Sequence, residues 1–264
     1  MIAAADPEAA SARAARRYVD ICAPTPPWNT NRDHRGARRR RRLRIGIHAL
    51  IPRSFLAELI GRYREDHPGI EVEITEGTAR EAVAQLRADQ LDVAFVAGSP
   101  KLPDCDARPI WTEPLMAVLP ERHPLAGQST VTWGDLVGET FLVRHGGTGP
   151  QVHDHILLRL AGRWPVPSIQ RFDVGRGTLL SMVGKGFGLT IVGAATALLP
   201  TSGVIFLPFA DEAEPVPFSA VWSPSNRSAA LRNLLDLAGK MGVQRDPSDD
   251  FSSSAGSIPR ASAI

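Results

Sequence analysis

Apolar and polar residues follow two periods in turn between residues 43 and 98, and each period predicts one kind of element. A period of two is typical of a strand and a spacing of about 3.6 is typical of a helix face, because of where successive side chains point. The segments alternate as strand, helix, strand, helix, strand over residues 43–47, 52–66, 70–75, 77–86 and 91–98. This alternation predicts a parallel sheet with helices packed on its faces.

A second series of elements is predicted after residue 115. We expect strands at 115–119, 140–143, 169–172, 189–192, 204–207 and 218–222. We expect helices at 132–136, 151–160, 175–183 and 229–240. Two such series are consistent with two lobes of similar architecture, each too small to enclose a ligand alone. Ligands of such sheets bind beyond the carboxyl ends of the strands, which in the first series are residues 48–52, 76–79 and 96–100.

Composition excludes several classes of protein. The chain has 264 residues, of which 43% are hydrophobic and 22% are charged, as in a globular protein. It contains no apolar run of about 18 residues, so no transmembrane helix is expected, and its first residues lack the apolar core of a secretory signal. The two cysteines, Cys22 and Cys105, make neither a disulfide framework nor a zinc site. We therefore expect a cytoplasmic protein without a metal.

Positive charge is concentrated near the beginning of the chain. The first 44 residues hold eleven arginines and four acidic residues. One interpretation of residues 1–42 is a solvated, disordered arm, and the other is a contact with the phosphate backbone of a nucleic acid. No helix-turn-helix pattern frames the arginines, which favours the disordered arm. From the run Arg38 to Arg42 we expect only weak, non-specific and salt-sensitive DNA binding.

The order of the motifs resembles one known family. The first series has Gly46 in its first strand, a His-Pro-Gly stop after the first helix, and Glu76-Gly77-Thr78 after the second strand. Further on, PLMAVLPERHPLAG and the glycine turn at 183–192 follow in the expected order. Residues 43–240 thereby resemble the effector-binding domain of LysR-type bacterial transcriptional regulators. No single motif is specific, and the ordered series carries the resemblance.

The resemblance implies an α/β fold of two Rossmann-like lobes of the periplasmic-binding-protein type, joined by two crossover strands. We expect lobe I at about 43–119 plus 206–240 and lobe II at about 120–205, with crossings near Leu119 and Val204. Residues 241–264, rich in serine, are expected to be a disordered tail. The family also implies a small-molecule effector in the cleft and assembly into dimers or tetramers.

The family places a winged helix-turn-helix and a linker helix before this domain. Neither is recognisable in residues 1–42, which are rich in proline and arginine. We expect a chain that is truncated, started at the wrong codon or descended from a regulator that lost its DNA reader. DNA binding is therefore expected only if a helix-turn-helix lies upstream.

Four candidate ligand residues belong to the first series. Leu50 and Ile51 follow the first strand, where they line the cleft or pack against the helix cap. Thr78 matches a cleft-facing hydroxyl of the family, and it also suits the N-cap of the helix that begins at Ala79. Val96 adds an apolar wall. The family usually has a serine or threonine near residues 49–51, and its absence here weakens anion capture or favours a more apolar ligand.

The other four candidates form a loop after a predicted strand of the second series. Arg144 could pair with a carboxylate through two hydrogen bonds. The loop continues with His145, Gly147 and Thr148, and its glycines permit a close approach of the backbone to a ligand. The alternative is an exposed loop with a solvated arginine. Together the candidates predict a small, carboxylate-bearing effector, aromatic or branched rather than a sugar.

Catalysis, metal binding and cofactor binding have little support. The chain has no Gly-x-Ser-x-Gly elbow. His153 and His155 lie two residues apart on a predicted helix, so they face different sides. The glycine turn at 184–188 lacks the ending of a phosphate loop. We expect no enzyme, no catalytic residue and no cofactor. A free-standing binding protein, or an enzyme on the same two-lobed fold, remains the alternative.

Overall fold

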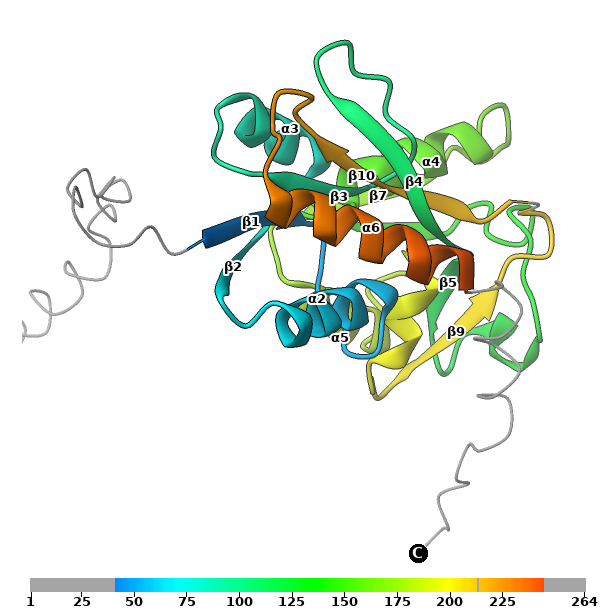
Figure 1. The fold of residues 1–264 in the computed structure, drawn as a ribbon. Coiled ribbons are helices and arrows are strands. Elements are labelled where there is room, and N and C mark those ends of the chain that lie inside the picture. Colours follow the sequence, from blue (N-terminus) through cyan, green and yellow to red (C-terminus); the bar gives the residue numbers. More distant parts are fainter. Residues whose placement is uncertain (1–40, 213, 245–264) are drawn as a thin grey trace, which may run out of the picture. The chain divides into compact units, whose positions relative to one another are not determined.

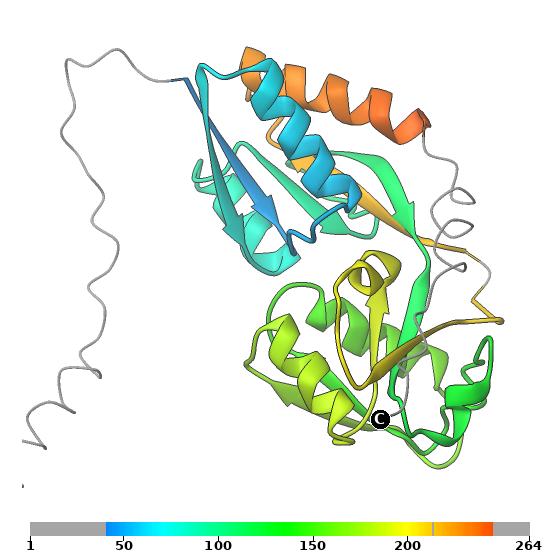
Figure 2. The same cartoon turned by 90° about the horizontal axis from the view of Figure 1, so that it is seen from below.

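The computed structural model describes residues 41–212 and 214–244, which form two α/β lobes (Figures 1 and 2). The strands are β1 Arg41–Ile47, β2 Ile70–Glu76, β3 Val93–Ala97, β4 Asp106–Glu113, β5 Leu115–Pro120, β6 Thr140–Arg144, β7 Ser168–Phe172, β8 Thr190–Gly193, β9 Val204–Pro208 and β10 Val216–Trp222. The helices are α2 Phe55–Asp66, α3 Ala79–Arg87, α4 Gly149–Arg159, α5 Arg176–Gly184 and α6 Ala229–Gln244, with short 3₁₀ turns η1 Pro124–Gly127 and η2 Ala194–Leu198.

Lobe I is built on one five-stranded sheet with the order β2-β1-β3-β10-β4. The three strands of the first series run parallel, with Leu43 paired to Val72 and Ile45 paired to Val93. Strand β10 comes from the far end of the chain and lies antiparallel between β3 and β4. The βαβ part of this sheet confirms the strand–helix alternation predicted from the first series.

Both faces of the lobe I sheet are covered by helices. Helices α2 and α6 pack side by side on one face, and the Tyr63 hydroxyl donates to the Ala230 carbonyl at 2.9 Å. On the opposite face α3 contributes Ala82 and Leu86 to a smaller core that includes Val96. Residues on the α2 and α6 face form the largest buried cluster, including Leu43, Ile45, Phe55, Leu59, Val93, Phe95, Leu231, Leu234 and Met241.

Lobe II has a three-stranded sheet in the order β8-β5-β9 and a parallel pair, β6 and β7. The two parts are linked at Phe141 and Leu189, where an isolated bridge joins β6 to the residue before β8. Helix α4 covers a core around Trp133 and Ile156. Helix α5 covers the opposite face through Leu179, Leu180 and Val183. The two-lobed α/β class predicted from the sequence is thus confirmed.

The chain changes lobe at other residues than those expected. Strand β4 belongs to the lobe I sheet and β5 to the lobe II sheet, so the first crossing lies at Pro114 and not near Leu119. The return lies between the end of β9 at Pro208 and the start of β10 at Val216, rather than near Val204. Strand β4 was not predicted because its first four residues are exposed and its apolar residues Ile110 and Trp111 are adjacent rather than alternating.

Several predicted boundaries also need correction. Helix α2 begins at Phe55 with Ser54 as its N-cap, and not at Pro52. The short helix predicted at 132–136 is a sequence of turns. Helix α6 continues to Gln244, and buried Met241 packs in the core, so the tail cannot begin at 241. Arg42, placed in the basic arm, lies in β1 and pairs with Glu73 at 3.1 Å.

The remaining predictions for the arm and the tail concern residues 1–40 and 245–264, which lie outside the described part of the chain. Among the helices of the described ranges, none combines the length and apolar character needed to span a membrane.

Candidate functional site

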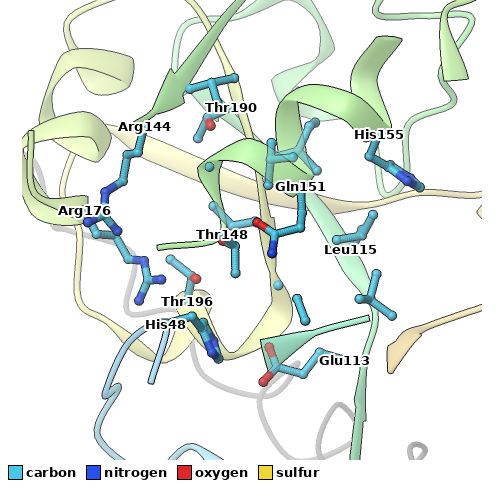
Figure 3. Close-up of a pocket in the computed structure, with 18 of the residues that line it drawn as sticks. His48, Glu113, Leu115, Arg144, Thr148, Gln151, His155, Arg176, Thr190 and Thr196 are labelled. Atoms are coloured by element: carbon cyan, nitrogen blue, oxygen red, sulfur yellow. The ribbon is translucent and has the colours of Figure 1, made fainter. Parts of the chain in front are cut away.

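A cavity of about 170 Å³ lies between the two lobes, at the carboxyl ends of their strands. Lobe I contributes residues after β1, at the ends of β3 and β4, and in β10. Lobe II contributes the end of β6, residues of α4 and α5, and β8. Most of the wall is apolar. The apolar and small lining residues are Ile51, Ala97, Gly98, Leu115, Val143, Gly149, Val152, Leu179, Leu180, Ile191, Val192, Gly193, Val216 and Phe218. The polar lining residues are His48, Glu113, Arg144, Thr148, Gln151, His155, Arg176, Thr190 and Thr196 (Figure 3).

Two helices begin at the cavity without a capping side chain. Thr148 precedes α4 and Gly175 precedes α5, and neither position supplies a side-chain hydrogen bond to the first turn. The first amides of a helix lack intrahelical partners and carry partial positive charge, so such ends attract anions. Gly149 allows α4 to begin this close to β6, because a Cβ there would lie 1.8 Å from the Arg144 carbonyl oxygen.

Arg144 is held by groups from both lobes. Its Nε donates to the Val174 carbonyl at 3.0 Å, inside lobe II. One of its terminal nitrogens lies 3.5 Å from a Glu76 oxygen, which belongs to lobe I. The side chain is only 15% exposed, whereas that of Glu76 is 51% exposed. Arg144 therefore reaches the cavity with part of its hydrogen-bonding capacity already used.

Arg176 is the first residue of α5 and lies beside Arg144 in the cavity wall (Figure 3). Among the described residues, no atom accepts a hydrogen bond from its guanidinium. Burial lowers the pKa of Arg176 from its usual value, and the Arg144 charge lowers it further, while the carboxylates of Glu76 and Glu113 act in the opposite direction. An arginine remains protonated under these conditions, so a partly buried positive charge, without a hydrogen-bonding partner among the described residues, faces the cavity.

His48 is a neutral polar group in the same wall. Burial lowers its pKa to about 4, and the positive charge of Arg176 contributes to the shift, while a backbone hydrogen bond to Phe95 opposes it. The ring packs against Phe218 with centroids 4.9 Å apart. Its Nδ1 is buried and, within the described ranges, has no hydrogen-bonding partner; the same holds for Oε1 of Gln151.

Other polar residues of the wall are engaged in the fold. The Glu113 carboxylate accepts from the Trp111 indole at 2.9 Å and from the Ala195 amide at 3.4 Å. The Thr190 hydroxyl donates to the Leu142 carbonyl at 2.6 Å. These groups shape the cavity, and their hydrogen-bonding capacity is at least partly used. The described residues contain no group of three or more His, Cys, Asp or Glu side chains suited to a metal ion.

His155 connects the cavity to a buried carboxylate. Its Nε2 lies 3.3 Å from Oε2 of Glu212, whose side chain is 6% exposed. The same carboxylate accepts from the Trp133 indole at 2.7 Å and from Arg159. These hydrogen bonds lower the pKa of Glu212 although burial alone would raise it. Glu212 lies in the return segment between the lobes, and it thus fastens this segment to α4.

The structure places three of the eight predicted site residues in the wall of the cavity: Ile51, Arg144 and Thr148. Leu50 is 45% exposed and His145 is exposed, and neither lines the cavity. Val96 faces α3, on the other side of the lobe I sheet, because alternate residues of a strand point to opposite faces. Its neighbour Ala97 lines the cavity instead.

Thr78 and Gly147 lie beside the cavity, in a smaller hollow. Thr78 accepts from the Glu81 amide at 3.2 Å, and Glu81 accepts from the Thr78 amide at 2.7 Å, so the two form a capping box. The structure thus shows the capping role of Thr78. Gly147 has a φ of 58° and approaches the His48 carbonyl.

Three polar residues of the cavity wall, His48, Gln151 and Arg176, were not predicted from the sequence. His48 lay within the predicted strand end at 48–52 but was not chosen, and Arg176 and Gln151 lie in first turns of helices that were predicted. A rule that examines the first helical turn after every strand, in both series, would have found Arg176 and Gln151.

The two α/β lobes enclose an apolar cavity with a helix N-terminus at its edge and a partly buried cation in its wall. This arrangement defines a small-molecule-binding domain of the two-lobed type. Comparison with known families agrees, because the model described as LysR substrate binding domain matches residues 36–242. The chain belongs to this family. One relative, the uncharacterized HTH-type transcriptional regulator YnfL of Escherichia coli, is 28% identical over 195 residues, which are 73% of this chain and 65% of that protein.

A second relative, the HTH-type transcriptional regulator TtuA of Agrobacterium vitis, is 26% identical over 200 residues, which are 74% of this chain and 66% of the relative. The chain thus spans slightly less than two thirds of the length of these regulators. Among solved structures, the BenM effector binding domain with its effector benzoate is similar at a TM-score of 0.66 and 20% identity, covering 77% of this chain and 93% of that one. The fold is therefore that of LysR effector-binding domains.

Proposed function

We propose that this chain is the effector-sensing part of a LysR-type regulator, and that it binds a small carboxylate of about the size of one six-membered ring between its lobes. The observation that carries the proposal is Arg176, a partly buried positive charge at an apolar cavity. Burying a charge without a partner costs free energy, and an anionic ligand would recover much of that cost. In this proposal Arg176 binds the anion, and the uncapped first turns of α4 and α5 assist.

The size and lining of the cavity support a single-ring ligand. A cavity of about 150 Å³ accommodates benzene in another protein, and the cavity here measures about 170 Å³. Apolar side chains such as Leu179, Ile191 and Phe218 offer contacts to the carbon skeleton. Two proteins of the same fold were solved with ring carboxylates, BenM with benzoate and QuiR with shikimate. Of the eight sequence-predicted residues, we retain Ile51, Arg144 and Thr148 as ligand contacts.

Several further properties belong to this proposal rather than to the geometry of the chain. We infer that it works as a regulator and not as an enzyme, in the cytoplasm, as a dimer or tetramer, and on DNA only together with a helix-turn-helix. The support is the family: its members among the relatives are transcriptional regulators, and one full-length member, CbnR, was solved in complex with target DNA.

Calorimetric titration of the chain with benzoate and with benzamide tests the anion site. We expect benzoate to bind and benzamide, of the same shape but uncharged, to bind at least about tenfold more weakly. Arg176→Gln should weaken benzoate binding by about 10- to 150-fold, because a hydrogen bond to a charged group contributes about 1.5–3 kcal/mol.

The matched control is Arg171→Gln, which removes an exposed arginine from β7 outside the cavity. Its benzoate affinity should equal that of the unmodified chain. If benzamide binds as tightly as benzoate, or if Arg176→Gln leaves the affinity unchanged, the cavity is not an anion site of this kind.

A further inference from the structure

The cavity wall carries two opposite charges on different elements. Arg176 begins α5 in lobe II, and Glu113 ends β4, at the connection from lobe I. The two charges act on each other, since the Glu113 carboxylate opposes the lowering of the Arg176 pKa. Arg176 nevertheless makes no ion pair with Glu113 or with another carboxylate of the described residues. A positive and a negative charge that do not touch therefore face the same cavity.

The Glu113 carboxylate is oriented by uncharged donors. It accepts from the Trp111 indole at 2.9 Å and from the Ala195 amide, at the start of η2, at 3.4 Å. Hydrogen bonds from N–H groups favour the ionised form of a carboxyl group, and neither of these donors carries a charge that would neutralise it. Figure 3 shows the carboxylate directed toward the side of the cavity where His48 and Thr196 lie. Glu113 thus presents a fixed negative charge to a ligand.

Thr196 adds a hydroxyl group on η2, the element that Glu113 contacts. The residue lines the cavity and is only 3% exposed, and its hydroxyl has no hydrogen-bonding partner among the described residues. Thr190, which is 2% exposed in the same wall, differs because its hydroxyl donates to the Leu142 carbonyl. Buried polar groups are nearly always hydrogen-bonded, so an unpaired one at a cavity indicates a bound partner.

The chemistry of these two groups favours a positively charged donor. An ammonium group has several N–H donors, and both a carboxylate and a hydroxyl oxygen accept. A hydrogen bond between two charged groups is about twice as strong as one between neutral groups. A second carboxylate of the ligand would be repelled by Glu113, and a methyl group would leave the Thr196 hydroxyl unpaired.

We propose that Glu113 and Thr196 form a second subsite that binds an ammonium group, so that the effector is a zwitterion, a small amino acid with a ring-sized carbon skeleton. The inference rests on the proposed function, with the carboxylate at Arg176. A simple carboxylate neutralises Arg176 but adds a negative charge to a cavity that already holds Glu113. A zwitterion pairs both charges of the wall and adds no net charge, while residues such as Leu179 contact its carbon skeleton.

The test compares ligands that differ in one ring atom. Calorimetric titrations use cyclohexanecarboxylate and the three piperidinecarboxylates, pipecolate, nipecotate and isonipecotate, in which a charged nitrogen replaces one ring carbon. All four have a six-membered ring and one carboxylate. We expect at least one piperidinecarboxylate to bind about tenfold more tightly than cyclohexanecarboxylate, or tighter still, because a hydrogen bond to a charged group contributes about this factor.

Two variants separate recognition of the ammonium group from a structural role. Glu113→Gln keeps an oxygen for Trp111 and removes the charge, so the preference should fall to about threefold or less. Cyclohexanecarboxylate should bind this variant as tightly as before or more tightly, because a negative charge has left the cavity. Thr196→Val keeps the shape of the side chain and should reduce the preference by about threefold or more, with cyclohexanecarboxylate unchanged.

The matched controls are Glu71→Gln and Thr75→Val, at exposed positions of β2, and both should keep the preference in full. Circular dichroism checks that each variant is folded. If Glu113→Gln does not fold, Thr196→Val decides alone, and an unchanged preference in that variant contradicts the inference.

The outcomes distinguish this inference from the function on which it rests. If Arg176→Gln weakens all four ligands but the four bind the unmodified chain equally, the inference is wrong and the anion site stands. The same holds if Glu113→Gln weakens cyclohexanecarboxylate and the piperidinecarboxylates to the same extent. If the piperidinecarboxylates keep their affinity in Arg176→Gln and lose it in Glu113→Gln, the anion site is wrong and the ammonium subsite stands. If none of the four ligands binds, both are wrong.

Discussion

Removing the Glu212 carboxylate should destabilise lobe II and its connection to lobe I. The side chain is 6% exposed and accepts hydrogen bonds from Trp133, His155 and Arg159. Glu212→Leu has a similar size but leaves the Trp133 indole N–H, which is itself buried, without an acceptor. A buried donor left unpaired costs about 1–3 kcal/mol. Arg159 is 40% exposed, so solvent screening limits the cost of losing its ion pair with Glu212 to about 1 kcal/mol or less. We expect a total of about 1–4 kcal/mol for this variant.

Glu212→Gln should cost less, about 1–2 kcal/mol. The amide oxygen can still accept from the Trp133 indole, while the charge toward Arg159 and His155 is lost. Urea unfolding followed by circular dichroism measures both variants. Glu214→Gln, an exposed acid two residues further along the same connection, is the control and should stay within about 0.5 kcal/mol of the unmodified chain.

The pH dependence gives an independent check. The hydrogen bonds hold the pKa of folded Glu212 below its usual value of 4.5. A depressed pKa means that the stabilisation is present above the unfolded value and is lost as the pH falls through the folded value. The stability difference between the unmodified chain and Glu212→Gln should therefore be largest near neutral pH and shrink in acid. A difference that stays constant from about pH 7 to about pH 3 would show that the ionised carboxylate does not contribute, and a Glu212→Leu variant as stable as the unmodified chain would refute the account of Trp133.

Three further predictions concern the edges of the cavity. Thr78→Ala should lower the stability by about 1 kcal/mol, through loss of the cap on α3, and should leave benzoate affinity unchanged in the same titration. Gly149→Ala should unfold at clearly lower urea concentration than the unmodified chain, because its Cβ meets the Arg144 carbonyl oxygen at 1.8 Å and the backbone must shift. Arg144→Gln should weaken benzoate binding less than the Arg176 substitution does, in side-by-side titrations, since Arg144 is already engaged by Val174 and Glu76.

The spacing of apolar residues was sufficient to predict most helices and strands, because most of them have one buried face. The strands at 43–47 and 140–143 and the helix at 151–160 were predicted to within a few residues, since each shows a regular apolar spacing. Strand β4 shows none, because it lies at the edge of the lobe I sheet with its first residues exposed. The position of the first crossing at Pro114 depends on β4, so both were missed together.

The site was predictable only where a strand end identifies it. Ile51 and Thr148 follow strands and line the cavity. Val96 and Leu50 also lie at strand ends, but the sequence does not determine which side of the sheet end faces the other lobe. The partner of each side chain is a tertiary property. Thr78 is hydrogen-bonded to Glu81 in a capping box. The sequence reveals such a box only once the start of the helix is known.

The two arginines of the cavity show why partners matter more than residue type. From the sequence, Arg144 is the better candidate, since it follows a strand and precedes glycines, whereas Arg176 merely begins a helix. In the structure Arg144 already contacts the Val174 carbonyl and the Glu76 carboxylate, so an anion that pairs with it must compete with Glu76. Arg176 has no such acceptor in the described ranges, and its depressed pKa reflects a charge that burial has made costly. A ligand carboxylate gains the most binding free energy from an arginine that gives up no existing hydrogen bond or ion pair to bind it. The affinity should therefore depend on Arg176, while any change at Arg144 also alters its contact with Glu76 in the other lobe.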